Sequence, residues 1–195
     1  MAGKAPLRRR LTGAAACGGL LLTGALLAGG PSAQGSRFAD ESDRVARAAL
    51  MTAEGDRVGH VRFEERWWDG GVRVQVRARD LPAGIHGFHV HMTGSCEPPS
   101  FTSAGGHLNL DGTDHPDHSG DMPTLLVTQD GEARASFATD RFSLDDLRDA
   151  DGSAVIVHEL PDNHANIPDR YASAPDEDTL DTGDAGGRIA CGEVE

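Results

Sequence analysis

Short apolar stretches separated by turn residues recur along the chain from residue 48 to the C-terminal end. Residues 72–78 alternate apolar and polar side chains with a period of two, which is typical of a strand with one buried face. Residues 58–67 also alternate, and the Asp69-Gly70-Gly71 sequence between the two stretches is a hairpin turn signal. The two stretches are therefore predicted to pair as an antiparallel hairpin.

Further stretches share this strand character, and residues 129–131 (Gln-Asp-Gly) join two of them into a second hairpin. These stretches are residues 48–53, 85–91, 125–127, 133–137, 154–157 and 188–194. Residues 142–148 are predicted to form a short turn or helical piece. About eight short antiparallel strands predict an all-β fold, a Greek-key β-sandwich or flattened barrel.

Two long segments lack a regular pattern. Residues 95–123 are polar and rich in Gly and His, and residues 161–187 are acidic and rich in Gly. Loops of this length inside a compact domain usually carry function. We therefore expect two long functional loops between the strands.

The first 35 residues have the layout of an export signal. Residues 1–10 are basic without an acidic residue, residues 11–28 are apolar and small, and Ala33-Gln34-Gly35 is a candidate cleavage site. Arg8-Arg9-Arg10 also resembles a twin-arginine signal. The alternative is a retained membrane anchor. Residues 36–45 are then a flexible lead-in and residues 46–195 the folded domain, in an exported, extracytoplasmic protein.

The chain is acidic, with 18 Lys and Arg against 31 Asp and Glu and a net charge of −13. Removal of residues 1–35 would leave 14 basic residues and a net charge of −17. Such a charge argues against nucleic acid and against an anionic membrane surface as the main partner. A length of 195 residues with 38% apolar residues suits one domain with a modest, mainly aliphatic core.

The mature chain would keep two cysteines, Cys96 and Cys191. In an exported protein such a pair predicts one disulfide, and the alternative is two free buried thiols. In the chain-entropy model, closing a loop of about 95 residues stabilises the fold by about 4–5 kcal/mol.

Nine histidines are many for this length, and their spacing suggests metal ligands. His89 and His91 flank Val90 on a predicted strand, so their rings share one face of a rigid support. His107, His115 and His118 follow in the long loop with Asp121. Three imidazoles and one carboxylate suit a tetrahedral zinc site.

His158 ends a predicted buried strand far along the chain. Copper favours several imidazoles in a near-square arrangement. Six His and one Asp can supply a copper site and a zinc site if one imidazole serves both ions. The alternative is a set of independent solvent-facing histidines.

At this point the sequence resembles the exported bacterial copper/zinc superoxide dismutases over nearly the whole mature chain. The segments that carry the resemblance are residues 84–91 (GIHGFHVH), 103–107 (SAGGH), 118–123 (HSGDMP), 157–158 (VH) and 183–192 (GDAGGRIACG). They occur in the order in which the family has them.

The resemblance implies a role for each site residue. The copper ligands would be His89, His91, His107 and His158, and the zinc ligands His107, His115, His118 and Asp121. Asp162 would link a copper histidine to a zinc histidine, and Arg188 would lie beside the open copper position. The disulfide between Cys96 and Cys191 would pin the loop beside Arg188. His86 would bond to backbone, and His60 and His164 match no ligand position.

One spacing departs from the family pattern. Only Pro116 and Asp117 separate His115 from His118, whereas many members have a longer spacer. The sequence leaves open whether both rings reach one zinc ion.

The resemblance implies an enzyme that converts superoxide to O₂ and H₂O₂ at copper, with His107 as the bridging ligand and Arg188 guiding the anion. The alternative is a non-catalytic, extracytoplasmic copper-binding or buffering module of the same fold. A homodimer and a membrane tether through residues 1–35 remain open.

Overall fold

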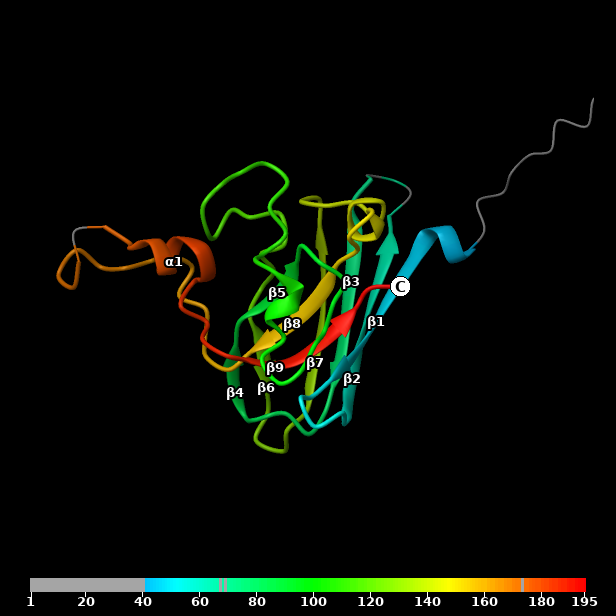
Figure 1. The fold of residues 1–195 in the computed structure, drawn as a ribbon, viewed down its shortest axis with the longest axis horizontal. Helices are drawn as coiled ribbons and strands as arrows, with labels where there is room; N and C mark the ends of the chain where they lie inside the picture. Colours follow the sequence, from blue (N-terminus) through cyan, green and yellow to red (C-terminus); the bar gives the residue numbers. More distant parts are fainter. Residues whose placement is uncertain (1–40, 67, 69, 173) are drawn as a thin grey trace, which may run out of the picture. The chain divides into compact units, whose positions relative to one another are not determined.

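The computed structural model describes residues 41–66, 68, 70–172 and 174–195, and the predicted export segment lies outside these residues. Nine strands dominate the described chain (Figure 1). They are β1 (Val45–Met51), β2 (Arg57–Glu65), β3 (Val72–Ala78), β4 (Gly84–His86), β5 (Phe88–His91), β6 (Leu125–Val127), β7 (Ala133–Thr139), β8 (Ala154–His158) and β9 (Arg188–Glu193). The helical pieces are η1 (Glu41–Arg44), η2 (Thr102–Ala104), η3 (Asp146–Arg148) and α1 (Glu177–Thr182).

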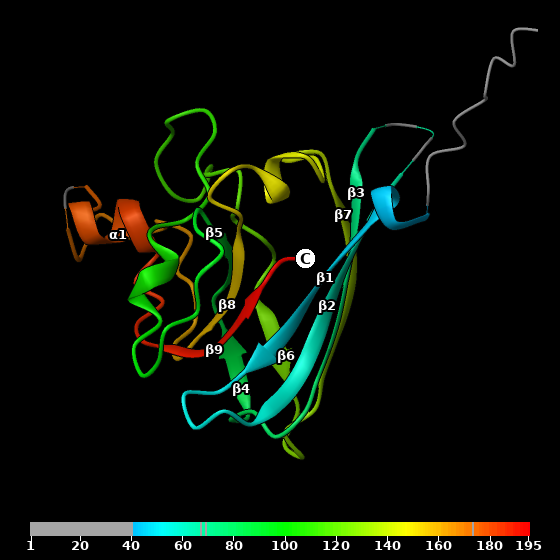
Figure 2. The same cartoon turned by 45° about the vertical axis from the view of Figure 1, so that its right-hand side comes forward.

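The strands form one antiparallel sheet in the order β4-β6-β7-β3-β2-β1-β9-β8-β5. The two end strands, β4 and β5, are consecutive in the chain and separated only by Gly87. The sheet therefore curls into a nearly closed barrel, as Figures 1 and 2 show. The β3 strand pairs with β7 while β4 pairs with β6, which gives the crossing connection of a Greek key. The predicted fold class is confirmed.

The period-two pattern of the sequence has the predicted consequence in the first hairpin. Strands β2 and β3 pair antiparallel, with Val61 opposite Val76 and Phe63 opposite Val74. All four side chains point inward and are buried in the barrel core. Phe142, after β7, packs edge-on against Phe63 at 6.1 Å between ring centres and closes that end of the core.

Some boundaries differ from those expected. The predicted strand 85–91 is two strands, β4 and β5, because Gly87 forms a hydrogen bond to Leu160 instead of continuing either ladder. Strand β1 begins at Val45, inside the predicted lead-in, and η1 precedes it. The second long loop contains α1, and the helical piece near residue 148 is η3. In the described part of the chain no helix is both long and apolar enough to cross a membrane.

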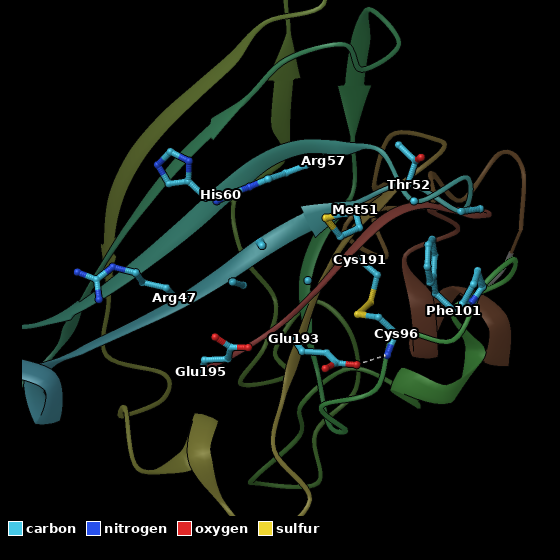
Figure 3. A pocket seen from close by; sticks show the side chains of 16 residues that line it. Arg47, Met51, Thr52, Arg57, His60, Cys96, Phe101, Cys191, Glu193 and Glu195 are labelled. Carbon is cyan, nitrogen blue, oxygen red and sulfur yellow. Dashed lines mark hydrogen bonds between the residues drawn. A yellow bond between two sulfur atoms is a disulfide. The ribbon is translucent and has the colours of Figure 1, made fainter.

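A disulfide joins Cys96 in the first long loop to Cys191 on β9, as predicted. Figure 3 shows the bridge under a groove, with Arg47, Arg57 and His60 from β1 and β2 on one side and the C-terminal Glu193 on the other. The Cys96 backbone N–H also donates to Glu193 Oε1 at 2.9 Å. The loop is thus fixed to the last strand by a covalent bond and a hydrogen bond.

Candidate metal centre

Four histidines converge where β5 and β8 lie side by side. His89 and His91 are on β5, His158 ends β8, and a bridge between His91 and His107 brings the first long loop beside β5. All four side chains are buried. One ring nitrogen from each lies within 4.8 Å of those of the others, so the four can hold one metal ion.

Hydrogen bonds to the outer nitrogens orient these rings. His91 Nδ1 donates to the Gly105 carbonyl at 2.9 Å, and His89 Nε2 donates to Asp162 Oδ2 at 2.7 Å. His158 Nδ1 faces the Gly186 carbonyl at 3.3 Å. Partners of this kind fix which nitrogen of a ligating imidazole is free for the metal.

The second nitrogen of each ring is not used by these hydrogen bonds. His91 Nε2 and His158 Nε2 face each other at 3.3 Å, while His89 Nδ1 and His107 Nε2 are buried without a hydrogen-bond partner. Buried polar atoms are seldom left unpaired in a folded protein. These unpaired nitrogens fit a metal ion that would take their lone pairs.

The protonation of this group also suits a metal. Burial lowers the pKa of His89 to about 4 and that of His158 to about 3, and it lowers the pKa of His91 well below the ordinary value. The rings are therefore neutral near pH 7. Neutral imidazoles offer the lone pair that copper binding requires.

A second set of ligands surrounds Asp121. Its carboxylate lies 2.8 Å from His107 Nδ1, 3.0 Å from His115 Nδ1 and 3.3 Å from His118 Nδ1. Gly120, which precedes it, lies against the Val90 carbonyl so closely that a Cβ atom would collide with it. Absence of a side chain at Gly120 thus lets the loop pack onto β5 between its two histidines.

The short spacer between His115 and His118 does not separate their rings, since both reach Asp121. His118 Nδ1 also lies 3.3 Å from His107 Nδ1. The four-residue group around Asp121 whose ligand atoms all lie within 4.8 Å of one another nevertheless contains His89, His107, His115 and Asp121 and leaves His118 out. Three nitrogens around one carboxylate match the donor set of a zinc site.

The charges of this second set are coupled. Burial alone would lower the pKa of His115, but the adjacent carboxylates of Asp121 and Asp162, the second of which accepts a hydrogen bond from the ring, raise it to about 9. Burial would raise the pKa of Asp121, but its hydrogen bonds with His107 and His115 hold it well below its usual range. Metal binding at His115 therefore has to displace a proton.

Asp162 joins the two sets. Its two carboxylate oxygens accept hydrogen bonds from His89 Nε2 at 2.7 Å and from His115 Nε2 at 2.8 Å. Those hydrogen bonds keep the Asp162 pKa low even though its burial would raise it. Gly183 directly follows the last residue of α1, with φ of 60°, and lies beside the hydrogen bond between His115 and Asp162. A Cβ atom at Gly183 would collide with both of these side chains.

Arg188 lies at the mouth of the centre. Its guanidinium donates to the carbonyls of Phe101 at 2.6 Å and Gly105 at 2.7 Å. The Gly105 carbonyl also accepts from His91, so one backbone group holds both side chains. Arg188 shares with His91, His107 and His158 a hollow of about 800 Å³.

The hollow also has an acidic wall. Asp178, Asp181 and Asp184 line it from α1 and the residue pair that follows (Figure 1 shows α1 outside the barrel). Arg188 is the one Lys or Arg among the described residues that line the hollow. This acidic wall was not predictable from the sequence, because the sequence of an acidic loop does not indicate which way its side chains face.

The remaining histidines have other surroundings. Both ring nitrogens of His86 lie against backbone carbonyls, those of His158 and Pro82, as expected. His60 is exposed on β2. His164 is half-exposed, stacks on His115 at 6.3 Å and comes within 3.5 Å of Asp162, a proximity that the sequence did not indicate.

The barrel thus carries two adjoining groups of residues that could hold metal ions, and His89 and His107 belong to both groups. The sequence matches the copper/zinc superoxide dismutase family over residues 57–194. It is 37% identical over 194 residues to the Superoxide dismutase [Cu-Zn] of Mycobacterium tuberculosis, covering 88% of this chain and 80% of the relative.

A superoxide dismutase-like protein of Bacillus subtilis is 33% identical over 157 residues, covering 74% of this chain and 73% of that protein. A crystal structure of an SOD-like protein from Bacillus subtilis superposes with a TM-score of 0.62 at 32% identity, over 75% of this chain and 96% of the other. The chain belongs to the copper/zinc superoxide dismutase family, and copper and zinc are the cofactors that its histidine cluster suits.

Proposed function

We propose that this protein is a copper/zinc superoxide dismutase. Two superoxide ions and two protons would give one O₂ and one H₂O₂. The observation that carries the proposal is the position of His107, which belongs to both ligand groups, with Nδ1 against Asp121 and Nε2 buried without a hydrogen-bond partner. One ring between two ligand sets is the arrangement that a shared imidazole requires.

Each of the two ligand sets would hold one of the two metals. The copper set is His89, His91, His107 and His158, and the zinc set is His107, His115, His118 and Asp121. Bound copper would supply the one-electron oxidation and reduction of superoxide, while zinc has no redox chemistry. Asp162 holds the rings of His89 and His115 at a fixed distance from each other, whichever metal is present.

The chain's own groups would bind the anion and supply a proton. Arg188, fixed by two backbone carbonyls, offers its remaining N–H groups to an anion in the hollow. His107 Nε2 is buried and has no partner in the protein, so it is the atom at which this ring can accept a proton and pass it to the product.

The proposal is tested by following superoxide decay by pulse radiolysis with the metal-loaded chain. We expect decay near the diffusion limit that disappears on removal of copper and returns when copper is restored. Stoichiometric copper binding without faster decay would contradict it. That result would favour the second candidate, a protein that binds copper without turnover.

The acidic wall of the hollow is the observation that favours this second candidate. Carboxylates at the mouth attract cations and oppose anions, which suits copper entry better than superoxide entry. One relative is a superoxide dismutase-like protein of Bacillus subtilis, so both candidate functions are compatible with membership of the family. The position of Arg188 at the mouth favours the enzyme.

Replacement of Arg188 by Gln is expected to lower the rate of superoxide decay by about tenfold at low ionic strength, because the hollow loses the cation that attracts the substrate. The difference from the unmodified protein should shrink as salt screens the charge. Arg170→Gln removes an equal charge from an arginine that packs on Tyr171 and does not line the hollow, and it should leave the rate unchanged. An Arg188→Gln protein with the full rate at low salt would remove Arg188 from the proposed mechanism.

Removal of the acidic wall should have the opposite effect. Asp178→Asn combined with Asp181→Asn is expected to raise the low-salt rate by about twofold to fourfold, because two charges that repel superoxide are lost. Glu177→Gln, on α1 but outside the hollow, is the matched control. A rate that stays the same or falls would show that the wall does not oppose the anion.

We also propose that the protein works outside the cytoplasm. The disulfide between Cys96 and Cys191 supports this location, since such bonds persist in oxidising compartments. The basic and apolar pattern of residues 1–35 supports it independently.

A further inference from the structure

A second hollow lies on the barrel away from the metal centre, where β2, β3 and β7 meet. We call it the arginine hollow. It has a volume of about 410 Å³, and its lining contains four arginines, Arg57, Arg77, Arg79 and Arg134, together with His60. Glu132 is the one acidic residue among those that line it. The arginine hollow shares no lining residue with the hollow at Arg188.

The sheet register places the basic residues of this hollow side by side. On the outer face, His60 is directly opposite Arg77, and Arg77 is directly opposite Arg134 on the next strand. Basic side chains that face each other across strands repel and destabilise a sheet. The arrangement therefore costs stability unless an anion is bound between them.

Neighbouring carboxylates neutralise only part of this charge. Arg134 pairs with Glu132 at 3.2 Å, and Arg79 pairs with Asp80 at 3.5 Å. In the described part of the chain neither Arg57 nor Arg77 has an ion pair with a carboxylate. Two exposed guanidinium groups thus remain available to a ligand.

A groove of mixed charge adjoins the arginine hollow. Arg57 and His60 also line this groove, shown in Figure 3, together with Arg47 and with the acidic residues Glu193 and Glu195. Such a concentration of arginines is unexpected in a chain of net charge −13. Charges farther away than a Debye length, about 10 Å at moderate salt, are screened, so the local positive charge governs binding at short range.

We propose that the arginine hollow binds a phosphate-bearing anion. Planar guanidinium groups match the oxygens of a phosphate group with two parallel hydrogen bonds, which makes arginine the preferred residue for such ligands. Arg57 and Arg77 make these contacts, Arg79 and Arg134 add positive charge around them, and the His60 ring lies beside them. The free phosphate ion and a phospholipid headgroup share this chemistry.

Inorganic phosphate is the first probe, titrated into the metal-loaded chain at low salt and followed by calorimetry. We expect saturable binding with a dissociation constant of about 1 mM or tighter. Arg57→Gln combined with Arg77→Gln should weaken it by at least about tenfold. Arg73→Gln, on the same strand and outer face as Arg77 but outside the hollow, should bind as the unmodified protein does.

The hollow beside the metals could also attract phosphate, so Arg188→Gln is the second control. Phosphate binding that is lost in Arg188→Gln and kept in the Arg57/Arg77 variant would overturn the proposal. This outcome does not bear on the proposed enzyme, because superoxide decay is measured separately.

Vesicles distinguish the two sources of phosphate. Sedimentation with vesicles of equal parts phosphatidylcholine and phosphatidylglycerol, compared with pure phosphatidylcholine, tests the headgroup. Co-sedimentation that needs phosphatidylglycerol and is lost in the Arg57/Arg77 variant supports a headgroup as the ligand. Phosphate binding without co-sedimentation supports the free ion, and absence of both contradicts the proposal.

Discussion

Replacement of His158 by Ala is expected to lower the superoxide decay rate and the affinity for copper by at least about a hundredfold each. His158 Nε2 faces His91 Nε2 at 3.3 Å, so its loss removes one of four converging nitrogens. The side chain is buried, and no other described residue could replace it in that group. Copper affinity is measured by competition with a chelator, and the rate by pulse radiolysis.

The matched control is His60→Ala, which removes an exposed histidine from the surface of β2. It should leave copper affinity and decay rate unchanged. Zinc content should remain high in the His158→Ala protein, because His158 does not contact Asp121. A His158→Ala protein with normal copper affinity and rate would contradict the assignment of the copper set.

Loss of the disulfide should have the largest effect on stability. Cys96→Ser combined with Cys191→Ser is expected to lower the free energy of unfolding by about 4 kcal/mol, since the bond closes a loop across a sequence separation of 95 residues. Urea unfolding of the metal-loaded proteins measures the difference. The activity per bound copper should also fall, because Phe101 and Gly105, whose carbonyls hold Arg188, belong to the loop that Cys96 anchors.

A thiol reductant provides the control for this prediction. It should destabilise the unmodified protein to the level of the double variant and leave the double variant unchanged. Equal stability of the double variant and the unmodified protein would show that the hydrogen bond from Cys96 to Glu193 and the packing around it hold the loop without the disulfide.

The strands were predictable because a barrel with one buried face gives a period-two pattern. Residues 72–78 were predicted as a strand with the bounds that β3 has. Strand β5 does not alternate between buried and exposed residues, because all four of its residues are buried. Its two histidines were the feature that distinguished this strand in the sequence. The split at Gly87 could not be predicted because it depends on a hydrogen bond to Leu160, far along the chain.

The ligand candidates were also visible in the sequence, because histidines stand out and metal sites need several of them. The groups that orient them were less visible. Gly105 and Gly186 act through backbone carbonyls, which every residue possesses, so no side-chain signal marks them. Asp162 was assigned only through the family resemblance, and the structure shows its hydrogen bonds with His89 and His115.

The acidic segment before Gly183 shows a further limit of sequence reasoning. Asp176, Glu177 and Asp178 belong to the acidic segment that the sequence predicts as a loop, and all three are exposed. Asp176 also caps α1 by accepting a hydrogen bond from the Thr179 backbone N–H at 2.9 Å. Because this short helix forms, Asp178 faces the metal hollow, a placement that depends on the tertiary fold.

The central claim is that His107 belongs to both metal sets. Electron paramagnetic resonance on the chain with Cu²⁺ in the copper set and Co²⁺ in the zinc set tests it most directly. We expect the isolated Cu²⁺ signal to disappear when Co²⁺ binds, through magnetic coupling across His107, and to persist in His107→Ala. An unchanged Cu²⁺ signal in the unmodified protein with both metals bound would contradict the claim.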